Sequence, residues 1–196
     1  MKKEEALHQF RTLVASDLIK THLQQLDDYF QLHQEQVSQE FVESFAKLCR
    51  SIRDKQDSGN MGPIGYITYS MLRTELLYDR WMCLVEAANK RWFLDTSRYE
   101  EGYDAAWIFS FWGELHTDLE QERRKYMGLI NPADVELIAL EQAAEFYRYL
   151  IRLATHAMPQ AVQLTEYRDM DKEDDLEVRV GEYLDVSELV YKESSA

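Results

Sequence analysis

Two glutamates, Glu75 and Glu86, are the residues best suited to acid–base chemistry, because each is flanked by apolar side chains. Carboxylate catalysis needs two such groups in one sheltered pocket, where burial raises the pKa of one of them. The alternative is that both glutamates lie on the solvated side of a β-hairpin and have no catalytic role. The sequence favours this second interpretation.

The spacing of the histidines gives little support for a metal site. One Glu-x-x-His pair, Glu5 and His8, lies in the charged first turns, whereas di-iron bundle proteins use two such pairs on facing helices. His116 and Glu120 are four residues apart and could point at one ion or substrate, but such pairs are ordinary on solvated helix faces. We therefore predict no metal site and no cofactor.

Common motifs for nucleophilic catalysis and nucleotide binding are missing from the sequence. Ser70 does not lie in a Gly-x-Ser-x-Gly elbow, and the seven glycines form neither a dinucleotide-binding motif nor a P-loop. Cys49 and Cys83 each stand alone inside an apolar pattern, which predicts two buried thiols in a reducing compartment. The sequence thus favours a non-catalytic protein.

The charge balance argues against two classes of partner. The chain has 22 Lys and Arg against 36 Asp and Glu, a net charge of −14, and such a surface repels phosphate backbones and anionic lipids. We therefore expect neither nucleic-acid binding nor membrane binding. Because no run of 18 apolar residues and no signal peptide is found, we expect a soluble, cytoplasmic protein.

Acidic residues are concentrated in the stretch 166–177, EYRDMDKEDDLE. Like charges so close together repel one another, which predicts a solvated loop that a basic partner would stabilise. This loop is either an electrostatic docking edge or a purely solubilising segment. The proposed docking residues are Asp171, Glu173, Asp174 and Asp175.

Aromatic residues are the unusual feature of the composition, at 12% of the chain. Their simplest role is to form a core between a hairpin and a helix. A sharper interpretation is that some remain half exposed as interface anchors, a role for which Trp and Tyr are well suited. Those in the central third are Tyr66, Tyr69, Trp81, Trp92, Tyr99, Tyr103, Trp107, Phe111 and Trp112.

The first 58 residues contain neither Gly nor Pro, and their apolar residues recur at helical spacing. The polar run 33–36 interrupts this pattern, which favours a helical hairpin over 1–54 with its turn there. One long helix is the alternative, because no cap or breaker enforces the turn.

The stretch 64–95 is predicted to contain strands. Residues 64–70 are rich in aromatic and β-branched side chains, which pack well on a sheet. In residues 81–87, Trp, Cys, Val and Ala alternate with Met, Leu and Glu, as on the two faces of a strand, and Asn89-Lys90 could turn the chain into a second short strand at 91–94. A helix over 71–88 is the alternative to this β-hairpin.

Two further helices are predicted within 104–158, and a strand within 176–191. Asp104 is expected to cap the first helix and Gly128 to end it. Asn131 and Pro132 start the second, which Pro159 should stop. The alternating residues after 176 predict an amphipathic strand that joins the hairpin as an antiparallel neighbour.

Together these patterns predict one α+β domain over 1–196, with about four helices on a small antiparallel sheet of three to four strands. The favoured function is a non-catalytic protein-interaction module, either a homo-oligomer or the partner of a basic protein. The alternative is a small-molecule-binding protein or enzyme whose pocket lies between the sheet and the helix starting at 104. Its ligand-binding residues would be Arg73, Glu86, Tyr103, Trp107 and His116.

Overall fold

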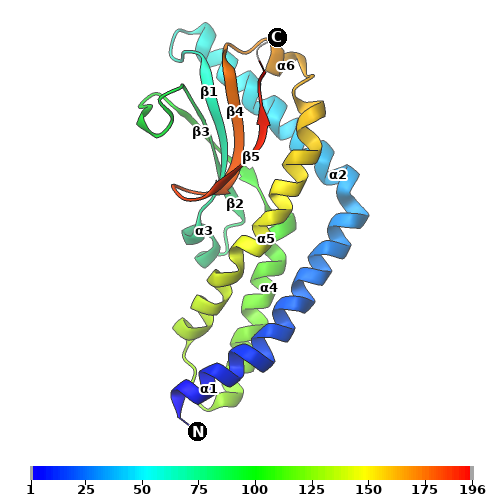
Figure 1. Cartoon of the computed structure of the whole chain (residues 1–196), viewed down its shortest axis with the longest axis vertical. Helices are drawn as coiled ribbons and strands as arrows, with labels where there is room; N and C mark the ends of the chain where they lie inside the picture. Colours follow the sequence, from blue (N-terminus) through cyan, green and yellow to red (C-terminus); the bar gives the residue numbers. More distant parts are fainter. Residues whose placement is uncertain (1, 195–196) are drawn as a thin grey trace. The chain divides into compact units, whose positions relative to one another are not determined.

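The computed structural model describes residues 2–194 and has the predicted α+β class (Figure 1). Within these residues, no helix has both the length and the hydropathy that crossing a membrane requires. The helices are α1 (Lys3–Gln9), α2 (Ser16–Asp57), α3 (Arg73–Leu77), α4 (Ala106–Arg123), α5 (Pro132–Ala161) and α6 (Thr165–Arg168). The strands are β1 (Ile64–Met71), β2 (Met82–Ala88), β3 (Tyr99–Asp104), β4 (Lys172–Glu182) and β5 (Ser187–Lys192).

The chain divides into two compact units, each made of segments far apart in the sequence. The helical unit contains the described part of Met1–Leu32 together with Arg73–Trp81 and Ala105–Tyr149. The sheet unit contains His33–Leu72, Met82–Asp104 and the described part of Leu150–Ala196.

The sheet is five-stranded, in the order β3-β2-β1-β4-β5. β1 is parallel to β4, and the other neighbours are antiparallel. The prediction that the C-terminal strand joins as an antiparallel neighbour is therefore wrong, as is the smaller strand number. A parallel pair needs a long crossover between its strands, and here the chain between β1 and β4 supplies it.

The predicted break at 33–36 is also wrong, because α2 runs without interruption from Ser16 to Asp57. Gln and Glu are good helix formers, so a polar run of this kind extends a solvated helix face. The side-chain amide of Gln36 donates to Glu40, and that of Gln39 donates to Glu43, each at 2.9 Å. Such pairs, four residues apart, stabilise a helix where no apolar side chain does.

The predicted β-hairpin is correct in its first strand and wrong in its second. β1 and β2 pair antiparallel, and only Arg73–Leu77 of the alternative helix forms. Residues 92–94 make a 3₁₀ turn instead of a strand, and the strand that follows β2 and pairs with it is β3. The sequence does not predict β3, because its residues, YEEGYD, include acids and Gly, which have low β-propensity.

The two later helices both form, although α4 ends at Arg123 and a 3₁₀ turn separates it from Gly128, where its end was predicted. Asp104 is the last residue of β3 and not a helix cap, since α4 begins after Ala105 without a side-chain cap. Asn131 does cap α5: its Oδ1 accepts from the N–H of Asp134 at 2.9 Å. Pro159 lies inside α5, which continues to Ala161, so the predicted stop is too early. A proline inside a helix removes one N–H donor and crowds the carbonyl four residues before it, so α5 ends within one turn after Pro159 instead of at it.

The acidic run is not the predicted loop over its whole length. Residues 165–168 form α6, and residues 172–175 belong to β4. The β1–β4 register shifts between the pairs Ile64–Lys172 and Tyr66–Glu177, which leaves Glu173, Asp174 and Asp175 in a bulge. Their backbone therefore continues the strand, while Asp174 and Asp175 remain exposed to solvent.

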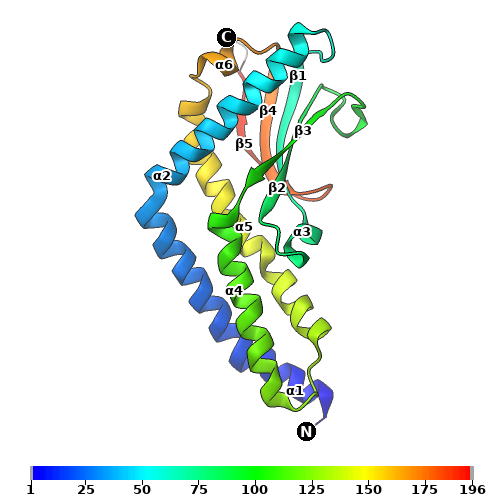
Figure 2. The ribbon, with the colours of Figure 1, turned by 180° about the vertical axis from the view of Figure 1, so that it is seen from behind.

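The sheet has two chemically different faces. On the face named here the core face, alternate strand residues pack against the C-terminal half of α2, which Figures 1 and 2 show lying across the sheet. The Phe41 ring lies 5.2 Å from Tyr69 and 5.8 Å from Tyr103. The opposite side, named the open face, carries the intervening residues. Those that matter below are Tyr66, Thr68, Glu86, Ala88, Glu100 and Arg179.

The helical unit has an aromatic core of its own. Phe30 stacks on Trp107 with ring centroids 5.7 Å apart. The indole Nε1 of Trp112 donates to the carbonyl of Ala139 at 2.8 Å, which satisfies the largest fully buried side chain of that unit. These aromatics therefore have the packing role that is the simpler of the two sequence interpretations.

Candidate functional site

A small groove opens on the open face of the sheet and encloses about 200 Å³, counting the solvent space at its mouth. Its floor comes from β1 and β2, and its wall comes from the loop of residues 89–98, named here the rim loop. The lining residues are Tyr66, Thr68, Glu86, Ala88, Trp92, Phe93 and Arg98.

Strand register places the groove floor. Thr68 lies opposite Glu86, and Tyr66 lies opposite Ala88 in the antiparallel β1–β2 pair. Because side chains two residues apart in a strand point to the same face, all four meet on the open face. Glu86 is only 5% exposed, which is unusual for a carboxylate.

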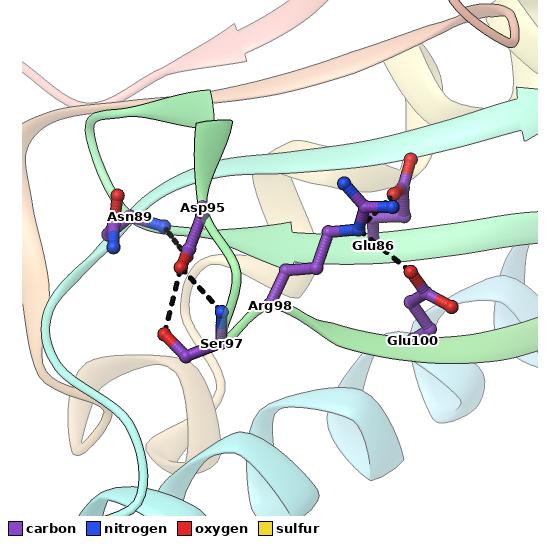
Figure 3. A network of polar contacts seen from close by, with 6 residues as sticks. All are labelled: Glu86, Asn89, Asp95, Ser97, Arg98 and Glu100. Atoms are coloured by element: carbon purple, nitrogen blue, oxygen red, sulfur yellow. Dashed lines mark hydrogen bonds and ion pairs between the residues drawn. The ribbon is translucent and has the colours of Figure 1, made fainter. Parts of the chain in front are cut away.

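A pair of carboxylates shares one guanidinium in this groove. Glu86 lies directly opposite Glu100 in the β2–β3 register, and like charges in that position destabilise a sheet. The Nε of Arg98 lies 2.9 Å from Glu86 and 2.7 Å from Glu100, as Figure 3 shows. One positive charge therefore neutralises only one of the two carboxylates.

Burial raises the pKa of Glu86 above its ordinary value, and the negative charge of Glu100 acts in the same direction. The charge of Arg98 and a hydrogen bond with Thr68 oppose this shift without cancelling it. Glu86 therefore takes up a proton more readily than an exposed glutamate does.

The rim loop is held in one conformation by Asp95 (Figure 3). One carboxylate oxygen accepts from the backbone N–H of Asn89 at 2.8 Å. The other accepts from the N–H of Ser97 at 2.9 Å and from its hydroxyl at 2.8 Å. Burial alone would raise the pKa of Asp95, but these hydrogen bonds lower it below the ordinary value. The loop is thus preorganised.

Trp92 occupies a strained position at the centre of the rim loop. Its φ is 50°, a region that bulky residues rarely adopt. Its ring stacks on Tyr66 at 4.3 Å and on Phe93 at 4.5 Å, and the Arg179 guanidinium lies 5.6 Å from the ring centre. Its buried indole N–H finds no hydrogen-bond acceptor within the described part of the chain. The surrounding contacts must therefore offset both costs.

The rim loop also exposes apolar surface. Phe93 is 45% exposed and Leu94 is 79% exposed, side by side next to the groove. Large apolar side chains held out by a rigid loop are typical of interaction sites.

Of the predicted ligand-binding residues, only Glu86 lines this groove. Tyr103 lies in the same sheet but on the core face, 4% exposed. The other three belong to the helical unit. There Arg73 donates to the Leu140 carbonyl at 3.5 Å, Trp107 stacks on Phe30, and His116 stacks on Trp112.

Sequence reasoning missed Glu100, Arg98 and Asp95. It paired Glu86 with Glu75, whereas Glu75 lies in the helical unit and binds the Nε of Arg80 at 2.7 Å. The partnership of Glu86 with Glu100 depends on strand register, which no local pattern encodes. Asp95-Thr96-Ser97 did carry a signal, because Asp commonly accepts from the backbone two residues on.

The predicted docking residues are anchored at one end of their segment. The carbonyl of Asp171 accepts from the N–H of Ile64 at 3.1 Å and from the side-chain amide of Gln56 at 2.7 Å. Just before it, Glu166 pairs with Arg50 at 2.7 Å, and Asp169 pairs with Arg53. The exposed acids that follow are therefore presented from a fixed strand.

Comparison with protein-family models, curated proteins and solved structures yields no match for this chain. Between residues 2 and 194, no group of three or more His, Cys, Asp or Glu side chains is arranged to hold a metal ion. The groove itself combines a partly uncompensated negative charge with aromatic walls, which suits a cationic side chain.

Proposed function

We propose that this chain is a non-catalytic protein-interaction module that binds a basic partner protein through the groove and the rim loop. The observation that carries the proposal is the rim loop. Asp95 fixes a loop that exposes Phe93 and Leu94 beside the carboxylate pair of Glu86 and Glu100.

The energetics of the rim loop support an interaction role. A positive φ at Trp92 and a buried indole N–H without an acceptor each lower stability, and two exposed apolar side chains add none through burial. A loop that only connected two strands could avoid all three with Gly and polar residues. A rigid loop gains affinity instead, since little conformational entropy is lost when it binds.

The charge distribution supports a basic partner. The chain carries a net charge of −14, and Glu86 in the groove and Glu100 beside it share the guanidinium of Arg98. Asp174 and Asp175 are exposed on β4 of the same unit. Such a field steers positively charged partners and speeds their association.

A small-molecule site is the second candidate, favoured by the raised pKa of Glu86 next to another carboxylate. Perturbed carboxylates in a cleft are a common feature of active sites. The groove, however, is too shallow to enclose even a water molecule, because its space is open to solvent, whereas ligand pockets usually enclose about 300–1,000 Å³. A shallow site of this kind favours contact with a protein surface.

Affinity capture from the lysate of the cells that express the protein tests the proposal. The Phe93→Ala/Leu94→Ala variant removes the exposed apolar side chains of the rim loop. Leu32→Ala is the matched control, because Leu32 and Leu94 are both 79% exposed. We expect a basic protein to be retained by the wild type and the control and lost by the double variant. Equal retention by all three, or a stoichiometric small molecule without a protein, would contradict the proposal.

A further inference from the structure

The two edges of the sheet differ in how they resist pairing with another strand. β5 is blunted by a bulge, seen as a register shift between Val178 and Arg179, and it ends in Lys192. β3 pairs with β2 through six consecutive residue pairs without a shift, and it contains neither Pro nor Lys. Bulges, Pro and Lys are the usual means of protecting an edge. β3 has none of these devices.

β3 is instead protected by acids. Its sequence YEEGYD includes Glu100 and Glu101 and no basic residue. Two copies of β3 side by side would bring carboxylates together, and facing like charges destabilise a sheet. An extended segment with basic residues would meet the opposite situation, because its cations would face these carboxylates. The acids of β3 therefore disfavour pairing between two copies of β3 and favour pairing with a basic strand.

We infer that β3 is the docking edge for an extended basic segment of the partner, which adds to the sheet as a further strand. The inference rests on the proposed function and specifies how the partner binds. Strand addition to a free edge gains main-chain hydrogen bonds, and alternate side chains supply specificity.

The carboxylate pair of Glu86 and Glu100 gives such a strand a specific position at which a basic side chain can bind. A Lys or Arg opposite Glu100 would pair with that carboxylate and leave Arg98 to Glu86 alone. Each carboxylate then has its own cation. Arg98 would no longer be shared between Glu86 and Glu100, from which its Nε now lies 2.9 Å and 2.7 Å. Because strand side chains alternate, basic residues at every second position would face the open side.

The rim loop lies at the end of the same edge, since it leads directly into Tyr99, the first residue of β3 (Figure 1). A strand paired along β3 would therefore extend toward the rim loop. An apolar side chain at that end could contact Phe93 and Leu94, which are exposed there. The two parts of the proposed interface are thus continuous.

Two peptides test the inference in the full chain at about 0.15 M salt, where exposed charges are screened over about 8 Å. The first is a short peptide that alternates lysine with threonine. The second has the same sequence with every backbone nitrogen methylated, so it keeps the charge and cannot pair as a strand. We expect the first to slow amide hydrogen exchange in β3, and the second to bind at least about tenfold more weakly, because the main-chain hydrogen bonds are lost.

Glu100→Gln should weaken the first peptide about two- to fivefold, the range of an opposite-charge cross-strand pair. Glu188→Gln on the other edge strand is the matched control, since Glu188 is also exposed, and it should leave the affinity unchanged. Equal binding of both peptides, protection at β5 instead of β3, or a dimer of the chain that pairs through β3 would overturn the inference. If β3 stays unprotected while capture still depends on Phe93 and Leu94, strand addition is wrong and the interaction module stands.

Discussion

The core face and the open face of one sheet bury their side chains by different means. On the core face, Tyr69 and Cys83 are each 1% exposed and are covered by apolar and aromatic neighbours. On the open face, Thr68 and Glu86 are 6% and 5% exposed, although both are polar. There the cover is a strained aromatic loop together with ion pairs at Arg98.

The two kinds of burial predict different roles for the two faces. Apolar burial adds stability directly, whereas a buried carboxylate gains stability only as far as its partners compensate for lost hydration. Glu86 shares its guanidinium with Glu100 and is compensated only in part. Changes on the core face should therefore affect folding, and changes on the open face should affect binding.

The largest effect is expected when a core-face aromatic residue is truncated. Phe41 is 0% exposed and lies between Tyr69 and Tyr103, so Phe41→Ala should lower the free energy of unfolding by about 3–5 kcal/mol. The matched open-face change is Phe93→Ala, which should cost less than about 1 kcal/mol because Phe93 is 45% exposed. Urea denaturation measures both. Similar losses would remove the distinction between the faces.

Cys83→Ser is a milder test of the core face. Both cysteines are buried and outside any disulfide, in agreement with the sequence prediction of buried thiols. The hydroxyl loses apolar burial and gains an unmet hydrogen bond, so we expect a loss of about 1–3 kcal/mol with partner binding retained. Burial raises the pKa of Cys49 to about 12, and Cys83 is 1% exposed, so neither thiol should react quickly with a labelling reagent. Rapid labelling of the native protein would show that Cys83 is accessible.

The two faces also differ in how much of their structure could be predicted from the sequence. The aromatic and β-branched residues of 64–70 and the alternation in 81–87 were enough to predict β1 and β2, and the Asn131 cap was visible as a short motif. The arrangement of side chains on the open face depends on which strand lies next to β2. That strand, β3, could not be predicted from its sequence YEEGYD. The groove needs that register, because it is what brings Glu100 opposite Glu86.

The continuity of α2 was hard to predict for a related reason. Apolar periodicity stops at 33–36, and the helix is maintained there by polar pairs such as Gln36–Glu40. The strain at Trp92 had no local signal either, because a positive φ is normally predicted from Gly or Asn. The stacking of Trp92 on Tyr66, together with the hydrogen bond from Asn89 to Asp95 within the loop, fixes its conformation.

Glu86→Gln should change how stability depends on pH. The folded chain holds the Glu86 proton more tightly than the unfolded chain does, since burial raises its pKa. Ionisation as the pH rises through this window therefore lowers the free energy of unfolding of the wild type. The variant has no such loss, so its stability relative to the wild type should rise as the pH increases above about 4, the ordinary pKa of a glutamate. Urea titrations of both proteins at several pH values measure this. A constant difference would mean that Glu86 is not perturbed.

The smallest structural effect is expected from the acids on β4. Asp171→Asn, Glu173→Gln, Asp174→Asn and Asp175→Asn together should leave the fold intact, because none of these side chains belongs to the core. If they steer a basic partner, association should slow in the variant, and the slowing should fade as salt shortens the screening length from about 10 Å at 0.1 M. Stopped-flow association rates at low and high salt test this. Equal rates for both proteins would leave the segment a solubilising role only.

The most direct test of the interaction surface is the Kd of the captured partner for Leu94→Ala and for Leu32→Ala. The two leucines are equally exposed, at 79%, and differ in that Leu94 lies on the rim loop and Leu32 on α2. We predict that Leu94→Ala weakens binding about tenfold, the effect of an interface anchor worth about 1.4 kcal/mol, while Leu32→Ala leaves the Kd unchanged. Equal affinities for the two variants, or a loss confined to Leu32→Ala, would contradict the account.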